Sequence, residues 1–248
     1  MTPSKFELDL SVPTCHFDSG SLMRPAAFFE IAQDLAVGGA TMVGAPDPVL
    51  KQKGVVWVLI RMHVQYDRLP RLYDKVHLQT WHAGVVGPLY IRDFVFKSME
   101  GDTLIRATSS WGLMDVENRS LARPARIFDV LPPEPQHPDR ALDTVAPKIF
   151  WPAGAEPASV SEHKVLYSDV DYNGHANNAR YPVWAYDTLP EELASSGRIS
   201  SFSINYNREL YLGQTAELRC LQDTDGSWIV EGLHADYQSF ICKIDFCK

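Results

Sequence analysis

The chain has 248 residues, of which 45% are hydrophobic and 22% charged, so it suits one large globular domain or two of about 120 residues. The formal net charge of −8 argues against nucleic acid or an anionic membrane as the main partner. No apolar run is long enough to cross a bilayer, and the opening MTPSKFELDLSV lacks the layout of a secretory signal, so a cytoplasmic location is expected. Four cysteines without a C-x-x-C pair and eight histidines without metal-ligand spacing predict no metal site, and no cofactor is expected.

The first predicted element is a helix within residues 24–44. Phe28, Ile31, Ala32 and Leu35 follow the i, i+3, i+4, i+7 stripe of a buried helical face. Four runs with β-branched and aromatic residues come next, separated by turn signals, at 55–69, 74–84, 89–98 and 102–116. This order predicts one helix followed by an antiparallel meander.

A proline-rich segment divides the chain. Seven of the 17 prolines lie between Pro132 and Pro157. Because proline resists both helix and central strand, residues 131–158 are expected to form an extended linker over the surface. This predicts an N-terminal domain over residues 1–130 and a C-terminal domain over 159–248.

After the linker the order of elements repeats. A short strand is expected at 163–167, a helix through Tyr181 and Trp184 to Thr188, and strands at 198–210, 215–223, 227–236 and 238–247. Individual residues repeat as well, at offsets of 140 for Tyr66 and Tyr206 and 153 for Asp18 and Asp171. The sequence therefore predicts a tandem duplication of an α+β unit, a helix wrapped by an antiparallel sheet.

The two copies differ where polar residues gather. The stretch YSDVDYNGHANNARYPVWAYD, residues 167–187, carries Asn173 and His175, whereas the first copy has Gly20 and Leu22 at the equivalent positions. Glu209 likewise corresponds to a leucine, Leu69. A role needed by the fold should occur in both copies, so polar residues confined to one copy predict a single active site.

At these residues the sequence resembles the plant-type acyl-acyl carrier protein (acyl-ACP) thioesterases and their bacterial relatives. The family's D-x-N-x-H-x-N-N run, followed by an aromatic-rich helix, matches Asp171, Asn173, His175, Asn177, Asn178 and then Tyr181 and Trp184. The family's later Y-R-R-E-C matches Tyr206, Asn207, Arg208, Glu209 and Leu210. Text in the first half, WVLIRMHVQYDRLPRLYDKVHLQTW and IRATSSWGLMDVENRSLARP, also looks like the family's, so the resemblance covers nearly the whole chain.

The resemblance implies a double hot-dog fold and hydrolysis of fatty acyl-ACP thioesters, an activity of fatty acid biosynthesis, with acyl carrier protein as partner. Two departures concern the site. Leu210 replaces the cysteine that follows the glutamate in plant members, which argues against a cysteine nucleophile. Pro182 stands inside the helix, where it is tolerable if Asn177 or Asn178 caps that helix.

The expected catalytic set is Asp171, Asn173, His175 and Glu209. Glu209 is the expected base, acting on a bound water, with His175 as the second polar group and Asp171 orienting its neighbours. Backbone N–H groups at the start of the helix are expected to favour the oxyanion. The candidate substrate-binding residues are Asn177, Asn178, Arg180, Trp57 and Phe28.

Alternatives remain at each level. The two asparagines could be ordinary cap and turn residues, Phe28 and Trp57 plain core, Asp169 a surface turn residue and Arg180 solvated. Other enzymes of the same fold, an acyl-CoA thioesterase or a hydroxyacyl dehydratase, are open, as is a non-catalytic module that binds acyl chains or carrier protein. The chain could be a monomer or a homodimer.

Overall fold

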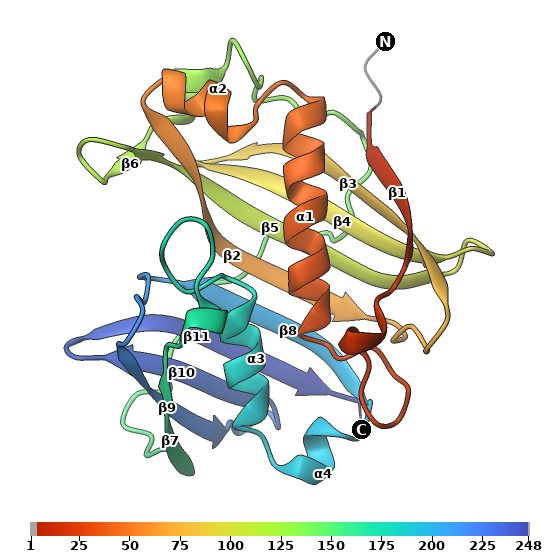
Figure 1. The fold of residues 1–248 in the computed structure, drawn as a ribbon, viewed down its shortest axis with the longest axis vertical. Helices are drawn as coiled ribbons and strands as arrows, with labels where there is room; N and C mark the ends of the chain where they lie inside the picture. The colour runs from red at the N-terminus through yellow and green to blue at the C-terminus, as the bar shows by residue number, and fades with distance from the viewer. Residues whose placement is uncertain (1–3, 248) are drawn as a thin grey trace.

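The computed structural model describes residues 4–247, which are arranged as one long, twisted antiparallel sheet with helices against one face (Figure 1). The strand order is β1-β3-β4-β5-β2-β8-β11-β10-β9-β7, and the short β6 pairs with β5. The half before the linker contributes β1 to β6, and the half after it contributes β7 to β11. No helix in the described part of the chain combines the length and the apolar character needed to cross a membrane.

The N-terminal half carries the longer elements. Their bounds are β1 (Phe6–Ser11), α1 (Ala27–Met42), α2 (Asp47–Gln52), β2 (Val55–Tyr66), β3 (Lys75–Val86), β4 (Leu89–Ser98), β5 (Thr103–Asp115) and β6 (Leu121–Ala122), with short 3₁₀ helices at Thr14–His16 and Pro124–Ile127. Helix α1 buries Phe28, Phe29, Ile31 and Leu35 against the sheet. The helix can lie close to the sheet at Gly39 because glycine has no side chain. A Cβ at this position would lie 2.3 Å from Arg92 Nη1 of β4.

The C-terminal half repeats this plan with smaller helices. Its elements are β7 (Ser159–Lys164), a 3₁₀ helix at Tyr167–Asp169, α3 (Arg180–Asp187), α4 (Glu191–Ala194), β8 (Ile199–Tyr206), β9 (Thr215–Gln222), β10 (Trp228–His234) and β11 (Tyr237–Phe246). Helix α3 spans eight residues against sixteen in α1, so the expectation of a long central helix in each half is wrong for the second. Strand β1 was not expected, and β7 begins before the predicted 163–167.

The duplication is confirmed hydrogen bond by hydrogen bond. Bonds in the first half recur in the second at the offsets of 153 and 140: Met23 N to Pro70 O (2.9 Å) with Ala176 N to Leu210 O (2.7 Å), and Tyr66 OH to Pro25 O (3.0 Å) with Tyr206 OH to Asn178 O (3.1 Å). The halves join through β2 and β8, where His63 pairs with Ser203, its own equivalent at offset 140. A local twofold axis therefore passes through this pair. The predicted α+β tandem arrangement, a helix against an antiparallel sheet in each half, is confirmed.

The linker follows the face of the sheet opposite α1. Residues 128–158 form no helix or strand. Asp93, which is fully buried, accepts hydrogen bonds from Arg140 Nε (2.8 Å) and the Ala141 N–H (2.8 Å), and Asn205 Oδ1 accepts one from the Ile149 N–H (2.8 Å). Successive residues of a strand face opposite sides of the sheet. On β4, Asp93 therefore faces the linker, and Phe94 faces Phe28 of α1.

Candidate active site

A cavity of about 1040 Å³ runs between the two halves. Its walls come from α1, α2, β2 and the ends of β3 to β5, and from two polar segments of the C-terminal half around residues 171–178 and 206–211. The volume lies at the upper end of the range for small-molecule sites, which suits a long ligand. Six of the predicted site residues line it: Trp57, Asp171, Asn173, His175, Asn178 and Glu209.

The polar turn before α3 is built on Asp171. Its Oδ1 accepts the Asn173 backbone N–H (2.8 Å), and its Oδ2 accepts one N–H of the Asn173 amide (3.4 Å). The Asp171 N–H in turn donates to the His175 carbonyl (3.1 Å). Asp171 therefore fixes the backbone of the turn and holds the side chain of its neighbour Asn173.

His175 has a defined tautomer in this geometry. Its Nδ1 lies 3.2 Å from the Ala176 carbonyl oxygen. Because a carbonyl only accepts, this contact requires a proton on Nδ1, and in that single-proton tautomer Nε2 is an acceptor. The ring is half-buried at the wall of the cavity.

Glu209 lies just after β8, and its carboxylate is engaged by two side chains that sequence reasoning missed. Arg119 Nη2 donates to Oε1 (3.1 Å) and Oε2 (3.0 Å), and the Tyr211 hydroxyl donates to Oε2 (3.3 Å). The Glu209 side chain is 30% exposed. Arg119 lies in the quoted stretch WGLMDVENRSLARP, yet it is 90 residues from Glu209 in the chain, and no local signal reveals such a contact.

The backbone N–H groups at the start of α3 already have partners. The Ala179 N–H donates to Asn177 Oδ1 and the Arg180 N–H to Asn177 O, both at 2.8 Å. Ala176 and Asn177 donate their N–H groups to Leu210 O (2.7 Å) and Asp169 O (2.8 Å). The expected oxyanion donors are therefore occupied at these four positions. The Asn173 amide keeps a second N–H that makes no such contact within the described residues.

Three predicted binding residues do not line the cavity. Phe28 is fully buried among aromatic rings, with Phe96 at a centroid distance of 4.9 Å, so it belongs to the core. Asn177 holds the turn ahead of α3 through the bond to Ala179. Arg180 is tied to the buried Asp169 and does not reach the cavity. Each was expected from its place in the motif, but a motif does not show which way a side chain points.

Asp169 supports the turn from beneath. It is 2% exposed, not a surface residue as expected, and accepts hydrogen bonds from the Leu166 N–H (2.9 Å), His163 Nε2 (3.1 Å) and Arg180 Nε (3.0 Å). Burial alone would raise the pKa of this carboxyl, but the bonds from Leu166, His163 and Arg180 lower it below its usual value. The start of the candidate site is therefore anchored by an ionised, buried aspartate.

We expect Asp169→Asn to lower the free energy of unfolding by about 1–3 kcal/mol, because an amide cannot satisfy three donors as a carboxylate does. A lowered pKa stabilises the folded state above the unfolded carboxyl pKa of about 3.9, and this contribution is lost as pH falls through the folded value. The gap between wild type and variant should thus be constant above about pH 5 and shrink in more acidic buffer. Urea unfolding across this range measures it, with the exposed Asp236→Asn as control. A gap that widens toward low pH would contradict the assignment.

The inner end of the cavity holds two buried polar side chains. His82 Nε2 lies 3.1 Å from the Pro132 carbonyl, and burial lowers the pKa of His82 to about 4, so the ring stays neutral. Arg92 Nη1 donates to Thr80 Oγ1 (3.3 Å), and burial lowers the pKa of its guanidinium to about 10, so it stays charged at neutral pH. Neither residue was predicted as part of the site.

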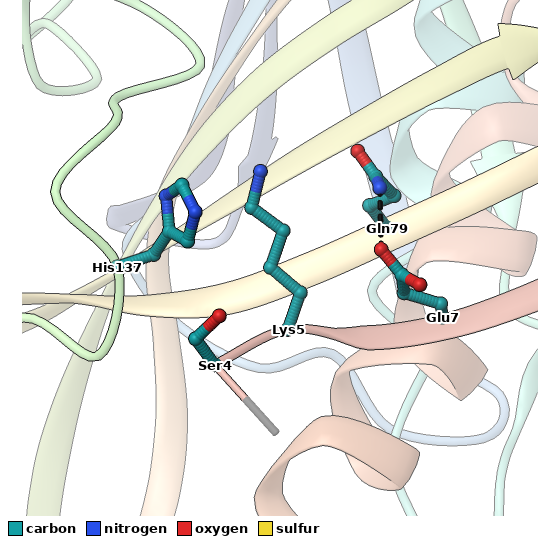
Figure 2. Close-up of a pocket in the computed structure, with 5 residues that line it drawn as sticks. All are labelled: Ser4, Lys5, Glu7, Gln79 and His137. Atoms are coloured by element: carbon teal, nitrogen blue, oxygen red, sulfur yellow. Dashed lines mark hydrogen bonds between the residues drawn. The ribbon is translucent and has the colours of Figure 1, made fainter. Parts of the chain in front are cut away.

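A second, shallower hollow lies beside β1 and contains none of the predicted residues. Ser4, Lys5, Glu7, Gln79 and His137 line it, and Gln79 Nε2 donates to Glu7 Oε1 at 2.5 Å (Figure 2). Lys5 Nζ stands 4.4 Å from the centroid of the Trp81 ring. Gln79 and Glu7 thus pair with one another, and His137 Nδ1 accepts the Asp139 N–H at 3.1 Å.

Family models match both halves of the chain. Residues 3–129 match the acyl-ACP thioesterase N-terminal domain and residues 154–241 the acyl-ACP thioesterase C-terminal domain. Among curated relatives, the chloroplastic oleoyl-acyl carrier protein thioesterase of Coriandrum sativum is 28% identical over 187 residues, which cover 70% of this chain and 49% of that protein. The chain therefore spans about half the length of the curated relatives it matches.

Solved structures share the fold over nearly the full length. An acyl-ACP thioesterase from Bacteroides thetaiotaomicron superposes with a TM-score of 0.85 at 24% identity, covering 98% of each chain. The 12:0-ACP thioesterase from Umbellularia californica superposes with a TM-score of 0.88 at 20% identity, covering 100% of this chain and 98% of that one. Since the two domain matches together cover most of the residues, the chain belongs to the acyl-ACP thioesterase family.

Proposed function

We propose that this chain hydrolyses the thioester of fatty acyl-ACP and releases the free fatty acid and holo-ACP. The observation that carries the proposal is the placement of Asn173, His175 and Glu209, which occur in one copy of the duplicated unit only, on the wall of one large cavity. The cavity extends from these polar groups to α1 and β2 of the other half, where Ala36, Val37 and Trp57 offer apolar surface to an acyl chain. The named activities of the relatives support the same reaction.

The proposed nucleophile is a water molecule, with Glu209 as the general base that activates it. The carboxylate takes a proton from the water as its oxygen attacks the thioester carbonyl carbon. The second N–H of Asn173 is the proposed donor to the developing oxyanion, because the backbone N–H groups of Ala176, Asn177, Ala179 and Arg180 are occupied. His175 Nε2, an acceptor, orients the attacking water. Collapse of the tetrahedral intermediate breaks the carbon–sulfur bond, and the proton held by Glu209 passes to the departing thiolate.

One assay tests the proposal against the alternatives. The protein is incubated with acyl-ACP and acyl-CoA thioesters of several chain lengths while free thiol and the acyl product are both followed. The proposal predicts thiol release with fatty acid as product, faster for acyl-ACP than for acyl-CoA. A hydroxyacyl dehydratase would form an enoyl thioester without thiol release, and a binding module would hold the acyl group without turnover.

Docking of an acidic carrier to an acidic chain requires local cations, since the net charges repel. Lys51 and Arg208 are exposed and line the cavity wall, where they are the proposed contacts for carrier or phosphopantetheine. Added salt shortens the Debye length, which is already only about 10 Å at 0.1 M, and so weakens attraction between exposed charges. We therefore expect added salt to raise KM for acyl-ACP while kcat changes little. Steady-state kinetics at low and high salt measure this, with a carrier-free acyl-pantetheine analogue as control. A KM for acyl-ACP that is insensitive to salt would refute the docking idea.

A further inference from the structure

The ion pair between Arg119 and Glu209 joins the two halves at the candidate site. Arg119 comes from the turn between β5 and β6 of the N-terminal half, whereas Glu209 follows β8 of the C-terminal half. One nitrogen, Nη2, contacts both carboxylate oxygens, at 3.1 Å and 3.0 Å. Both side chains line the large cavity. The first copy has Leu69, 6% exposed, at the position equivalent to Glu209, so it offers no carboxylate there.

The turn that presents Arg119 is built to hold its shape. Asp115 Oδ1 accepts the N–H groups of Glu117 and Asn118, each at 3.0 Å, and Asp115 Oδ2 accepts Arg126 Nη1 at 2.6 Å. The Arg119 N–H closes the turn on the Asp115 carbonyl at 2.9 Å. Arg119 itself adopts a left-handed backbone with φ of 48°, which few side-chain-bearing residues do. These contacts hold the backbone of the turn, and the Arg119 side chain extends from it to Glu209 of the other half.

The contacts leave the two oxygens of Glu209 unequal. Oε2 accepts from Arg119 and from the Tyr211 hydroxyl, while Oε1 accepts from Arg119 alone. Each carboxylate oxygen can accept about two hydrogen bonds, so Oε1 keeps one free acceptor position within the described residues. A base with a single open acceptor position receives its proton from one direction, which is what aiming at a bound water requires.

We propose that Arg119 is a positioning residue for the reaction, holding the Glu209 carboxylate turned so that Oε1 faces the nucleophilic water. This inference rests on the proposed function, since it needs Glu209 to act as the base. It assigns a role across the duplication: the half without a catalytic carboxylate supplies the cation that orients the carboxylate of the other half. Tyr211 completes the arrangement by occupying Oε2.

The test uses Arg119→Gln and Arg119→Lys in the full chain. Gln has backbone preferences close to those of Arg, so the left-handed position is not made worse, and Lys keeps the charge without the planar fork. Arg123→Gln is the matched control, because Arg123 is exposed, lies four residues along and has no ion pair among the described residues. Thermal unfolding of each variant checks that the chain is folded.

We expect Arg119→Gln to lower kcat roughly 10- to 100-fold with KM changed less than about twofold, because a displaced base loses rate and not affinity. Arg119→Lys should recover part of the loss, and Arg123→Gln should match wild type. In a Glu209→Gln background, Arg119→Gln should cause no further loss, since its effect runs through that carboxylate.

Three results would overturn the inference: wild-type kcat in Arg119→Gln, a raised KM at unchanged kcat, or the same fractional loss in both backgrounds. The second would make Arg119 a substrate contact, and the third would make its effect independent of Glu209. These outcomes differ from failure of the proposed function, in which the wild-type chain itself releases no thiol from acyl thioesters.

Discussion

Glu209→Gln is expected to lower kcat for acyl-ACP hydrolysis by roughly 10²–10⁴-fold, the range that a general base contributes. Gln has the shape of Glu and can still accept from Arg119 and Tyr211, so the change removes basicity with little disturbance of the site. The proposed acyl-chain contacts, Ala36, Val37 and Trp57, lie in the N-terminal half, so KM should stay near the wild-type value. Steady-state thiol release with saturating acyl-ACP measures the effect.

The matched control is Glu162→Gln, an exposed residue of β7 that removes the same charge away from the cavity. It should leave kcat unchanged. Full activity in Glu209→Gln would remove the base from the mechanism, and a large rise in KM at constant kcat would make Glu209 a binding residue.

Asn173→Asp should lower kcat by roughly 10²–10³-fold, the loss typical of removing one oxyanion donor. Asp retains the size of the side chain but donates no hydrogen bond when ionised, and its charge opposes the negative charge that develops on the carbonyl oxygen. Asn173→Ala removes the donor without adding charge, so it should be less impaired than Asn173→Asp. Comparison of the two kcat values separates the donor from the charge.

The same pair of variants can contradict the assignment. If Asn173→Asp turned over acyl-ACP at the wild-type rate, the amide would not donate to the oxyanion, and another group would have to. Equal kcat values for the two variants would show that no negative charge develops beside residue 173.

The duplicated fold could be predicted because its signals are local and repeated. Strands 55–66 and 199–206 each end at the tyrosine of a Tyr-x-Arg run, and the offsets of 140 and 153 found in the sequence reappear as hydrogen bonds. Strand β1 was missed although FELDL alternates apolar and polar residues as a strand does, with Phe6 and Leu10 packed against the core and Glu7, Leu8 and Asp9 exposed at the sheet edge. Helix α3 is short because Thr188 ends it and Pro190 follows closely.

The site was predicted in part, for a related reason. Asp171, Asn173 and His175 lie within five residues, so one turn brings them together, and Glu209, proposed from the asymmetry between copies and from the family resemblance, lines the same cavity. Arg119, which binds Glu209, comes from a distant part of the chain, 90 residues away, and could not be found in this way.

The direction in which each side chain points could not be predicted from the motif. Arg180 and Asp169 sit eleven residues apart and fold toward one another beneath the turn, while neighbours in the same motif face the cavity. Sequence spacing shows which polar side chains lie near the turn. Packing decides which of them face the cavity and which, like Arg180 and Asp169, bond to one another beneath the turn.

The central claim, hydrolysis of acyl-ACP by an activated water at Glu209, is tested most directly by a single turnover of acyl-ACP in ¹⁸O-labelled water. The mass of the acyl product is measured with enzyme in excess. The account predicts free fatty acid carrying one ¹⁸O atom from the first turnover, together with one equivalent of thiol. An unlabelled first-turnover fatty acid would show that an enzyme oxygen attacks the thioester, and an enoyl thioester without free thiol would show that the reaction is not hydrolysis.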